Sequence, residues 1–346
     1  MKVLFLTEGP SHIGHGHVTR CLSLYQAFEM LGSKPHMIVQ GDYTIYSLLQ
    51  NKSFELYPWL EDWKNRKEKL RDFDAVVVDS YLASIEVYED ISRSVPIKLF
   101  IDDYKRLAYP PGFVLNGSVY GQELKYPRTE GVVYLLGPAY VPLRKAFWKV
   151  KRKYIRKKLR SVLVTLGGAD PRNITPEVLR LLRKEHPELE LFVVVGKGFK
   201  NKEEVYKLKG EKIKVFEGLS GEEMKNIMSL VDLAVSAGGQ TTYELARVGV
   251  PSVLVAVADN QLLNCKGWAK TGFALYAGWW EDKELWQGLL ESVEKLKDYE
   301  LRLKMSRIGR KIVDGKGALR VAKKLIKAVQ KAQKSFSPLS LPYPSQ

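Results

Sequence analysis

Cysteine and long apolar runs are both scarce in this sequence of 346 residues. Its 2 cysteines, Cys21 and Cys265, lie far apart in segments typical of helices, so we expect reduced, buried thiols in a cytoplasmic protein. No apolar run reaches the roughly eighteen residues that a membrane-spanning helix needs. The first residues, MKVLFLTEGP, indicate a strand and a turn, and they lack the longer apolar core of a signal peptide. These absences argue against a disulfide-stabilised secreted domain and against an integral membrane protein.

Acidic residues are missing from one stretch, residues 144–160, which contains ten basic side chains. Three interpretations of this stretch stay open: a solvated face between domains, RNA contact, or docking on an anionic membrane surface, with Phe147 and Trp148 set among the lysines. No nucleic-acid-binding module is recognisable, so we expect no nucleic-acid partner. Weak contact of this basic linker with a membrane surface remains an expectation.

The rest of the composition is typical of a globular protein with two α/β domains. Hydrophobic residues make up 45% and charged residues 27% of the chain, and its length allows two cores. Short apolar runs alternate with helical stretches, which predicts parallel, doubly wound sheets. We expect an N-terminal Rossmann-like domain over 1–144, a basic linker over 145–160, a second Rossmann-like domain over 161–334 and a flexible tail over 335–346.

The pattern also predicts individual elements. Residues 114–142, rich in glycine, proline and tyrosine, are expected to be irregular. The predicted strands are 3–6, 36–39, 75–79, 97–101, 161–166, 191–195, 213–216, 233–236 and 252–255. The predicted helices include 17–31, 240–248, 283–303 and 319–332.

The most distinctive stretch is DLAVSAGGQTTYELARVG, residues 232–249. A short apolar strand is followed by Gly238 and Gly239, and a helix then starts at Gln240. Glycines before a helix start let backbone amides approach a phosphate, which the positive end of the helix favours. Glu244, one turn further on, faces back toward that opening and can accept hydrogen bonds from a ribose diol. The alternative is an ordinary strand-to-helix turn with a surface glutamate.

The unusual loops all fall at the carboxyl ends of predicted strands, where doubly wound domains bind their ligands. Two such domains facing one another would place these loops around a single cleft, which favours a nucleotide sugar as the ligand. The loops are GHGH, 79–81, 102–103, 167–170, 238–241 and 258–261.

His17 is the sharpest candidate for chemistry. It lies at the start of a predicted helix, where the helix dipole disfavours the imidazolium, so we expect a neutral ring that can act as a general base. His12 and His15 are close in sequence, and the pattern alone does not choose among the three, all of which could instead be loop or capping histidines. A metal site is disfavoured because no third ligand accompanies His15 and His17.

Polar residues follow other predicted strands. Asp79 and Tyr81 are expected to reach the cleft and position a sugar hydroxyl or a water, although Asp79 could instead cap the following helix. Asp102 and Asp103 are adjacent, so their side chains should point apart, and a cap or turn role is expected. The amides at 260–261 open a helix and could hold a carbonyl or a hydroxyl.

Together these motifs resemble a known family. In chain order they are GHGHVTRCLSL, VDSY, IDD, GPAYVPLR, TLGGADPRN, SAGGQTTYEL and ADNQ. Their order and spacing over residues 1–320 are similar to those of the UDP-sugar hydrolase of pseudaminic acid biosynthesis. That family is related to the two-domain glycosyltransferases of peptidoglycan lipid synthesis and to proteins linked to spore-coat or surface polysaccharides. The resemblance implies the α/β GT-B fold, two Rossmann-like doubly wound domains facing an interdomain cleft, with no metal and no cofactor.

The resemblance also implies roles for individual residues. The family's G-x-G-H motif falls on Gly14, Gly16 and His17, which makes His17 the catalytic histidine, with Tyr81 and Asn260 as its catalytic partners at the sugar and the water. The implied substrate-binding residues are Gly14, Gly16, Arg20, Asp79, Gly168, Asp170, Gly238, Gly239, Gln240, Thr241, Glu244 and Gln261.

These observations predict cleavage of the bond between the anomeric carbon and the diphosphate of a UDP-linked amino-deoxy sugar of the diacetamido-trideoxy altropyranose type. The products would be UDP and the free sugar, with inversion. The alternative is a GT-B glycosyltransferase that uses a polysaccharide or lipid-linked acceptor, because the same residues would serve both reactions. A third hypothesis is a nucleotide-sugar sensor without turnover. The expected partner is the UDP-sugar substrate, and the chain is expected to be a monomer.

Overall fold

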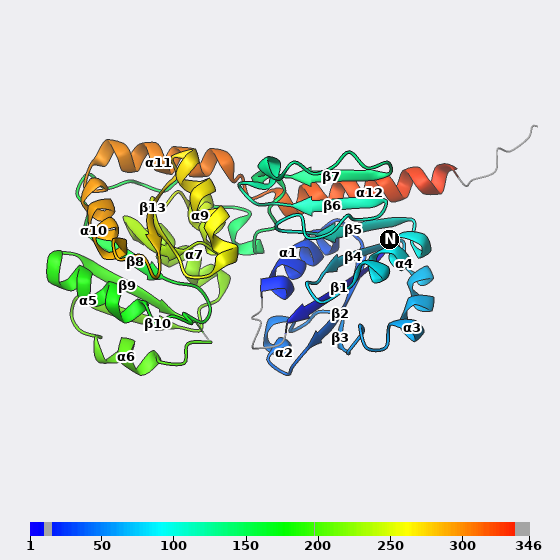
Figure 1. Cartoon of the computed structure of the whole chain (residues 1–346), viewed down its shortest axis with the longest axis horizontal. Coiled ribbons are helices and arrows are strands. Elements are labelled where there is room, and N and C mark those ends of the chain that lie inside the picture. The colour runs from blue at the N-terminus through cyan, green and yellow to red at the C-terminus, as the bar shows by residue number, and fades with distance from the viewer. Residues whose placement is uncertain (10–15, 197, 336–346) are drawn as a thin grey trace, which may run out of the picture.

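The computed structural model describes residues 1–9, 16–196 and 198–335, and it contains two parallel sheets, each with helices packed on it (Figure 1). The predicted fold class is confirmed, because both sheets are doubly wound in the Rossmann-like manner. The two sheets occupy opposite ends of the long axis of the molecule. Of the tail predicted over 335–346, residues 336–346 lie outside the described residues.

The first sheet has 7 strands in the order β3-β2-β1-β4-β5-β6-β7. The central strand β4 has the sequence AVVVD, and all five residues are buried, as expected for a strand covered on both faces. The strands are β1 (Lys2–Gly9), β2 (Lys34–Gly41), β3 (Phe54–Leu56), β4 (Ala75–Asp79), β5 (Ile97–Ile101), β6 (Gly112–Asn116) and β7 (Val132–Leu136).

Two long helices share the core on one face of this sheet, α1 (Gly16–Met30) and α12 (Gly317–Ser335). Phe28 of α1 and Leu325 of α12 belong to the same buried cluster. The other face packs on α4 (Ile85–Ser94), with Tyr88 in its core. The shorter helical elements are α2 (Ile45–Leu48), α3 (Trp63–Arg66), η1 (Lys67–Asp72), η2 (Gly121–Leu124), η3 (Pro138–Tyr140) and η4 (Lys145–Phe147).

The second sheet has 6 strands in the order β10-β9-β8-β11-β12-β13. Its strands are β8 (Ser161–Thr165), β9 (Glu190–Val195), β10 (Ile213–Glu217), β11 (Leu233–Ala237), β12 (Ser252–Ala256) and β13 (Ala274–Trp279). Its helices are α5 (Thr175–Glu185), α6 (Lys202–Lys207), α7 (Gly221–Leu230), α8 (Thr241–Val248), α9 (Asp259–Thr271), α10 (Leu285–Lys295) and α11 (Tyr299–Ile312).

Strand order places the candidate site. In the first sheet the order reverses between β1 and β4, and in the second sheet it reverses between β8 and β11. Crevices for ligands form at such reversal points, outside the carboxyl ends of the strands. Asp79 is the last residue of β4, and the segments after β1, β8 and β11 contain His17, Gly168 and Gly239. The topology therefore places the predicted residues at the two expected positions.

The chain crosses between the two sheets twice. At the first crossing Phe147 is buried in the core of the second sheet, whereas the adjacent Trp148 is buried in the core of the first. At the second crossing the backbone runs close to the first, since a Cβ on Gly317 would lie 2.1 Å from the carbonyl oxygen of Val141. The division of the chain at 144 and 160 stays a prediction; it assigns α12 to the second domain, but α12 packs on the first sheet.

One local prediction is confirmed in part and one needs correction. Residues 114–142 contain the end of β6, all of β7 and the short elements η2 and η3, and the rest of the stretch is irregular, as expected. The single helix predicted over 283–303 is two helices, since α10 ends at Lys295 and α11 starts after Asp298. The Asp298 carboxylate accepts a hydrogen bond of 3.0 Å from the Leu301 amide, which caps the new helix.

Both cysteines are buried and free, as predicted. Burial raises the pKa of both thiols, to about 12 for Cys265, so neither is activated as a nucleophile. Among the helices of the described ranges, none combines the length and the apolar composition that crossing a bilayer requires.

Candidate functional site

His17 is the second residue of α1, the helix that follows β1 in the chain. Its side chain is buried, while Gly16 before it is exposed and has open space where a Cβ would lie. The other parts of the predicted histidine motif, His12, Gly14 and His15, lie outside the described residues.

A carboxylate holds the His17 ring. Asp79, the last residue of β4, is fully buried, and its Oδ1 lies 2.6 Å from His17 Nδ1. This contact uses Nδ1 and fixes the orientation of the ring. The second ring nitrogen, Nε2, has no hydrogen-bond partner in the described part of the chain. The alternative in which Asp79 caps the next helix is wrong, because α4 begins only at Ile85 and follows Ser84.

The protonation of His17 differs from the prediction made from the helix dipole. Burial lowers the pKa of His17, but the charge of Asp79 and its hydrogen bond outweigh burial, and the pKa is raised above 6.5. The expected lowering is therefore wrong: an ionised carboxylate in direct contact has more effect than the partial charge of a helix start. The pKa of Asp79 is held well below its usual range, against the effect of its burial, by Arg20 and His17.

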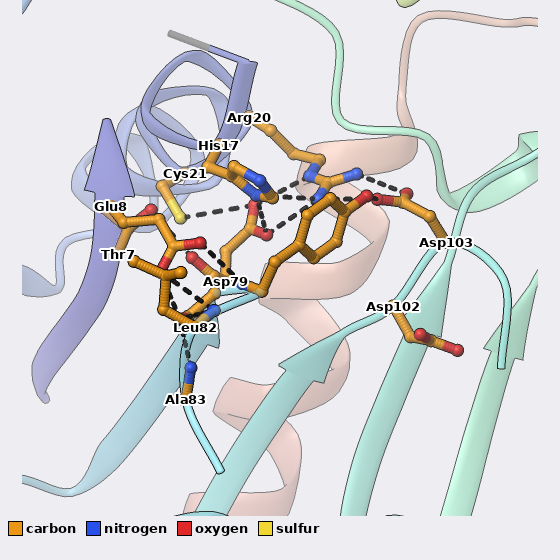
Figure 2. Close-up of polar contacts among 12 residues, drawn as sticks. Thr7, Glu8, His17, Arg20, Cys21, Asp79, Leu82, Ala83, Asp102 and Asp103 are labelled. Atoms are coloured by element: carbon orange, nitrogen blue, oxygen red, sulfur yellow. Dashed lines mark hydrogen bonds and ion pairs between the residues drawn. The ribbon is translucent and has the colours of Figure 1, made fainter. Parts of the chain in front are cut away.

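Arg20 joins two carboxylates, one from each of two neighbouring strands. Its guanidinium donates to both oxygens of Asp79 at 2.7 Å, and it donates to Asp103, which follows β5, at 2.5 and 3.1 Å. Figure 2 shows this chain of contacts from His17 through Asp79 and Arg20 to Asp103. Asp102 points away from it, where it accepts from the amides of residues 105 and 106. The prediction that the two aspartates point apart is confirmed, but only Asp102 has the expected turn role.

Tyr81 completes the cluster. Its ring meets the His17 ring edge-on with centroids 4.4 Å apart, and its hydroxyl donates to Asp103. Glu8, at the end of β1, is fully buried and accepts hydrogen bonds from the Tyr81 amide at 2.7 Å and from the Ser80 hydroxyl. Glu8 thereby fixes the turn that carries Tyr81 against His17.

The two glycines after β11 have different environments. A Cβ on Gly238 would lie 2.4 Å from Cys265 Sγ, so Gly238 is required for close packing of the loop on α9. The Gln261 side chain braces the same loop, because its Oε1 accepts from the Gly238 amide at 3.2 Å and from the Val257 amide at 3.1 Å. Gly239 has open space at its Cβ position, so the backbone there is accessible to a ligand.

Helix α8 begins at Thr241, immediately after Gln240. The amides of Thr242 and Tyr243 donate to the carbonyls of Gly239 and Gln240, each at 3.1 Å, and the first turn carries the positive end of the helix dipole. Glu244, in the first turn, is buried, and both of its carboxylate oxygens accept from Arg144, each at 2.6 Å. This charge raises the pKa of Arg144 despite its burial. The ribose role of Glu244 stays a prediction, and the structure adds Arg144 as its partner.

A cavity lies between the two halves of the chain. Its lining includes Arg20 and Asp103 from the first half and Gln240 and Tyr243 from the second. The Tyr243 hydroxyl also accepts from the Val119 amide at 3.0 Å, which links α8 to the first half. Arg20 and Asp103, which bind Asp79 and Tyr81, therefore line the same small space as Gln240, the residue before α8.

Three predicted residues are not joined to this cluster by any described contact. Asn260 is exposed near the start of α9. Asp170 is buried, and its carboxylate accepts from the amides of Ile174 at 3.1 Å and Thr175 at 2.8 Å, so it supports the start of α5. Gly168 has open space at its own Cβ position, and its carbonyl accepts from the Gly198 amide at 2.9 Å. Their ligand roles stay predictions.

Sequence reasoning left Asp103, Glu8 and Arg144 out of the predicted site. Asp103 had a usable signal, because it ends a strand next to β4, but its side-chain direction relative to Asp102 was not known. Glu8 lies within a strand that could be taken as ordinary core. Arg144 is a hundred positions from Glu244, so no local pattern pairs them.

Two Rossmann-like domains around one cavity define the GT-B class of fold, and solved glycosyltransferases share it. MurG of Acinetobacter baumannii superposes with a TM-score of 0.71 at 16% identity, over 94% of this chain and 100% of that one. At that identity the likeness shows the fold alone. Residues 161–317 match the model of the glycosyltransferase family 28 C-terminal domain.

The resemblance predicted from the motifs is confirmed by curated relatives. The chain is 27% identical to the spore coat polysaccharide biosynthesis protein SpsG of Bacillus subtilis, over 93% of this chain and 96% of that protein. It is 25% identical to the UDP-2,4-diacetamido-2,4,6-trideoxy-beta-L-altropyranose hydrolase of Campylobacter jejuni, over 53% of this chain and 66% of that protein. A protein of Helicobacter pylori, named both as this hydrolase and as pseudaminic acid cytidylyltransferase, is 23% identical over 78% of this chain. The chain spans 46% of that protein and 56% of another curated relative.

Proposed function

We propose that this protein hydrolyses a UDP-linked amino-deoxy sugar, releasing UDP and the free sugar with inversion at the anomeric carbon. The observation that carries the proposal is the buried His17–Asp79 pair, whose Nδ1 and Oδ1 lie 2.6 Å apart, and which Arg20 connects to the cavity that Gln240 also lines. A base on one side and an anion-binding helix start on the other match the two needs of this reaction.

The chemistry follows from the two ends of the site. Nε2 of neutral His17 takes a proton from a water, whose oxygen bonds to the anomeric carbon while the bond from that carbon to the diphosphate oxygen breaks. The electron pair of the broken bond leaves on UDP. Asp79 holds the ring by Nδ1 and stabilises the imidazolium that forms. Its charge therefore stabilises the transition state more than the ground state.

The second half of the chain would hold the leaving group. Amides around Gly239 and Thr241, which the open position of Gly239 leaves accessible, would stabilise the charge that grows on the diphosphate. The Arg144–Glu244 pair would present a fixed carboxylate to the ribose hydroxyls. UDP is a good leaving group, so no separate strong acid is required.

The relatives support this substrate class. Two of them are named for hydrolysis of a UDP-linked diacetamido sugar, and a third is named for spore coat polysaccharide biosynthesis. Hydrolysis of such a sugar for a nonulosonic acid or a surface polysaccharide is therefore the activity that we infer for this chain.

The test is incubation of the purified protein with a panel of UDP-sugars, without any acceptor, while UDP release and the anomer of the free sugar are followed by NMR. We expect release from the UDP-linked diacetamido-trideoxy altropyranose, with the inverted anomer appearing first. His17→Leu should lose most turnover and keep UDP binding, measured by calorimetry. Near-wild-type turnover in that variant would refute the role of His17.

A glycosyltransferase is the second candidate, and the match to the family 28 domain is the observation that favours it. Base, cavity and helix start would act in the same way, with an acceptor hydroxyl replacing water. UDP release that stays negligible until a sugar or lipid-linked acceptor is added would support the transferase and refute the hydrolase.

A further inference from the structure

Helix α12 presents an unusually uniform charge to its surroundings. It contains six basic residues and no acidic residue in 19 positions. Its apolar side, which includes Val321 and Leu325, is buried against the first sheet, so folding has already used that side. The exposed residues of its middle turns are Lys323, Lys324 and Lys327. No ion pair of these three lysines is found within the described residues.

A second group of cations lies where the linker meets α11. Arg152, Arg307 and Arg310 line a groove together with Tyr154, whose side chain is 79% exposed. Burial and the like charge of Arg152 lower the pKa of Arg310. Arg152 and Arg307 have no carboxylate partner in the part of the chain that the structure describes, so this positive charge is not compensated locally.

The linker is held rigidly, which keeps these cations in place. Arg302 of α11 is buried and donates to the carbonyls of Arg156 at 2.8 Å and Lys157 at 2.7 Å. On the other side, Lys153 is buried and donates to the carbonyls of Met228 and Ser229. Because the inward side chains fix the backbone, the outward ones form a preorganised surface.

The two groups lie on consecutive helices and on the linker beside them. Figure 1 shows α11 and α12 following one another along the same long edge, with one at each half of the chain. A helix of 19 residues is about 28 Å long at roughly 1.5 Å per residue. The exposed cations of the two helices therefore extend over a distance that exceeds a single small ligand.

We propose that this basic edge docks on an anionic lipid bilayer. We define the basic edge by its exposed members: Lys151, Arg152, Tyr154, Lys157, Lys158, Lys304, Arg307, Lys311, Lys323, Lys324 and Lys327. Cations on an outward, extended surface fit a plane of negative headgroups, and an exposed tyrosine among them fits the interfacial layer. A single nucleic-acid strand would need several aromatic rings for stacking, whereas Tyr154 is the one strongly exposed aromatic residue in the linker.

The proposal replaces an expectation that the structure contradicts. Phe147 and Trp148 cannot be the aromatic residues that dock on a membrane, because both are buried in the two cores. Their apolar character in the sequence serves the junction of the domains, and the exposed ring in the basic segment is Tyr154.

The test is sedimentation of the full-length protein with vesicles of phosphatidylcholine alone or mixed with phosphatidylglycerol. One variant replaces Lys323, Lys324 and Lys327 by alanine, which keeps the helix propensity of α12 high. A second variant replaces Arg152 and Arg307 by alanine. The matched control replaces Lys200, Lys207 and Lys209, which are exposed on and around α6, at another edge of the second domain.

We expect binding to the anionic vesicles only, and weaker binding as salt rises. Each cation near the surface contributes roughly a fivefold factor, so the α12 variant should bind about a hundredfold more weakly and the double variant about thirtyfold more weakly. The control should stay within about threefold of the wild type, because its charges lie beyond the screening length from the docked surface. All variants should keep their rate of UDP release, since these residues lie outside the His17 cluster.

Two results would overturn the proposal. An equal loss in the α6 control would mean that net charge, and not this edge, determines binding. Absence of vesicle binding, with or without binding of a single-stranded RNA probe, would show that the edge does not dock on a bilayer. Loss of UDP release with intact vesicle binding would instead count against the proposed function and leave the membrane proposal standing.

Discussion

Replacing Asp79 by asparagine removes the charge that sets the protonation of His17 while it keeps the size of the side chain. Burial and Arg20 both lower the pKa of His17, and Asp79 is the main group that raises it. An opposite charge in contact typically moves a pKa by about 1–3. Without that charge only the smaller effect of Glu8 still raises the pKa, while burial and Arg20 lower it, so the pKa of His17 in Asp79→Asn should fall below 6.5.

The pH dependence of UDP release follows directly. In the wild type the base is neutral only above its raised pKa, so the rate should fall on the acid side with a midpoint above 6.5. In the variant the midpoint should move below 6.5. Its plateau should also be lower, by about 10²–10⁴, because a less basic and less firmly held ring takes the proton poorly.

The assay is UDP release followed by NMR between about pH 5 and 9, the range over which a histidine titrates. UDP affinity and the thermal midpoint serve as controls for folding, since Arg20 keeps Asp103 as a partner.

The stability of the wild type should change in the same pH range. The raised pKa of His17 stabilises the fold at low pH, and this contribution is lost as pH rises through that pKa, whereas the lowered pKa of Asp79 stabilises the fold above about 4 and is lost on acidification. If the pH midpoint of UDP release stays in place or rises in Asp79→Asn, Asp79 does not control the protonation of His17.

Three further predictions concern the leaving-group side and the neighbouring tyrosine. Gly238→Ala should lower the free energy of unfolding by about 1–3 kcal/mol, because the new methyl group meets Cys265. Gly239→Ala should fold normally and weaken UDP binding by about tenfold. Equal melting temperatures of the two variants would contradict this difference. Glu244→Gln should weaken UDP binding by about tenfold in calorimetry, since only one of its two oxygens remains to accept, and unchanged affinity would remove this residue from the ribose site. Tyr81→Phe should lower turnover by at least about tenfold with a loss of stability near 1 kcal/mol, and a pH profile identical to that of the wild type should separate it from Asp79→Asn.

The sequence was sufficient for the architecture and for most of the strands around the site. Continuous apolar runs such as AVVVD end in polar residues, and this change marks both a buried parallel strand and the place where a ligand binds. The less reliable places were those in which tertiary packing decides the structure. Strands β6 and β7 lie among glycines and prolines that weaken the local pattern, and the break before α11 depends on one capping aspartate.

The site was predicted less completely than the fold. Motif order located His17, Asp79 and Tyr81, and these three do lie together. The direction of the pKa of His17 could not be predicted, because it depends on a contact between residues 62 positions apart. The partner of Glu244 was missed for the same reason.

The placement of α12 has a consequence for how the chain is made. Val321, Ala322 and Leu325 complete the core of the first sheet, yet they are synthesised after the whole second sheet. A nascent chain halted before residue 317 would expose the apolar surface of α1 and β5 that α12 covers. Fragments divided at the linker should therefore behave unequally. The piece that ends at 160 should bind a hydrophobic dye or a chaperone, and a separately added peptide of residues 317–335 should relieve that exposure.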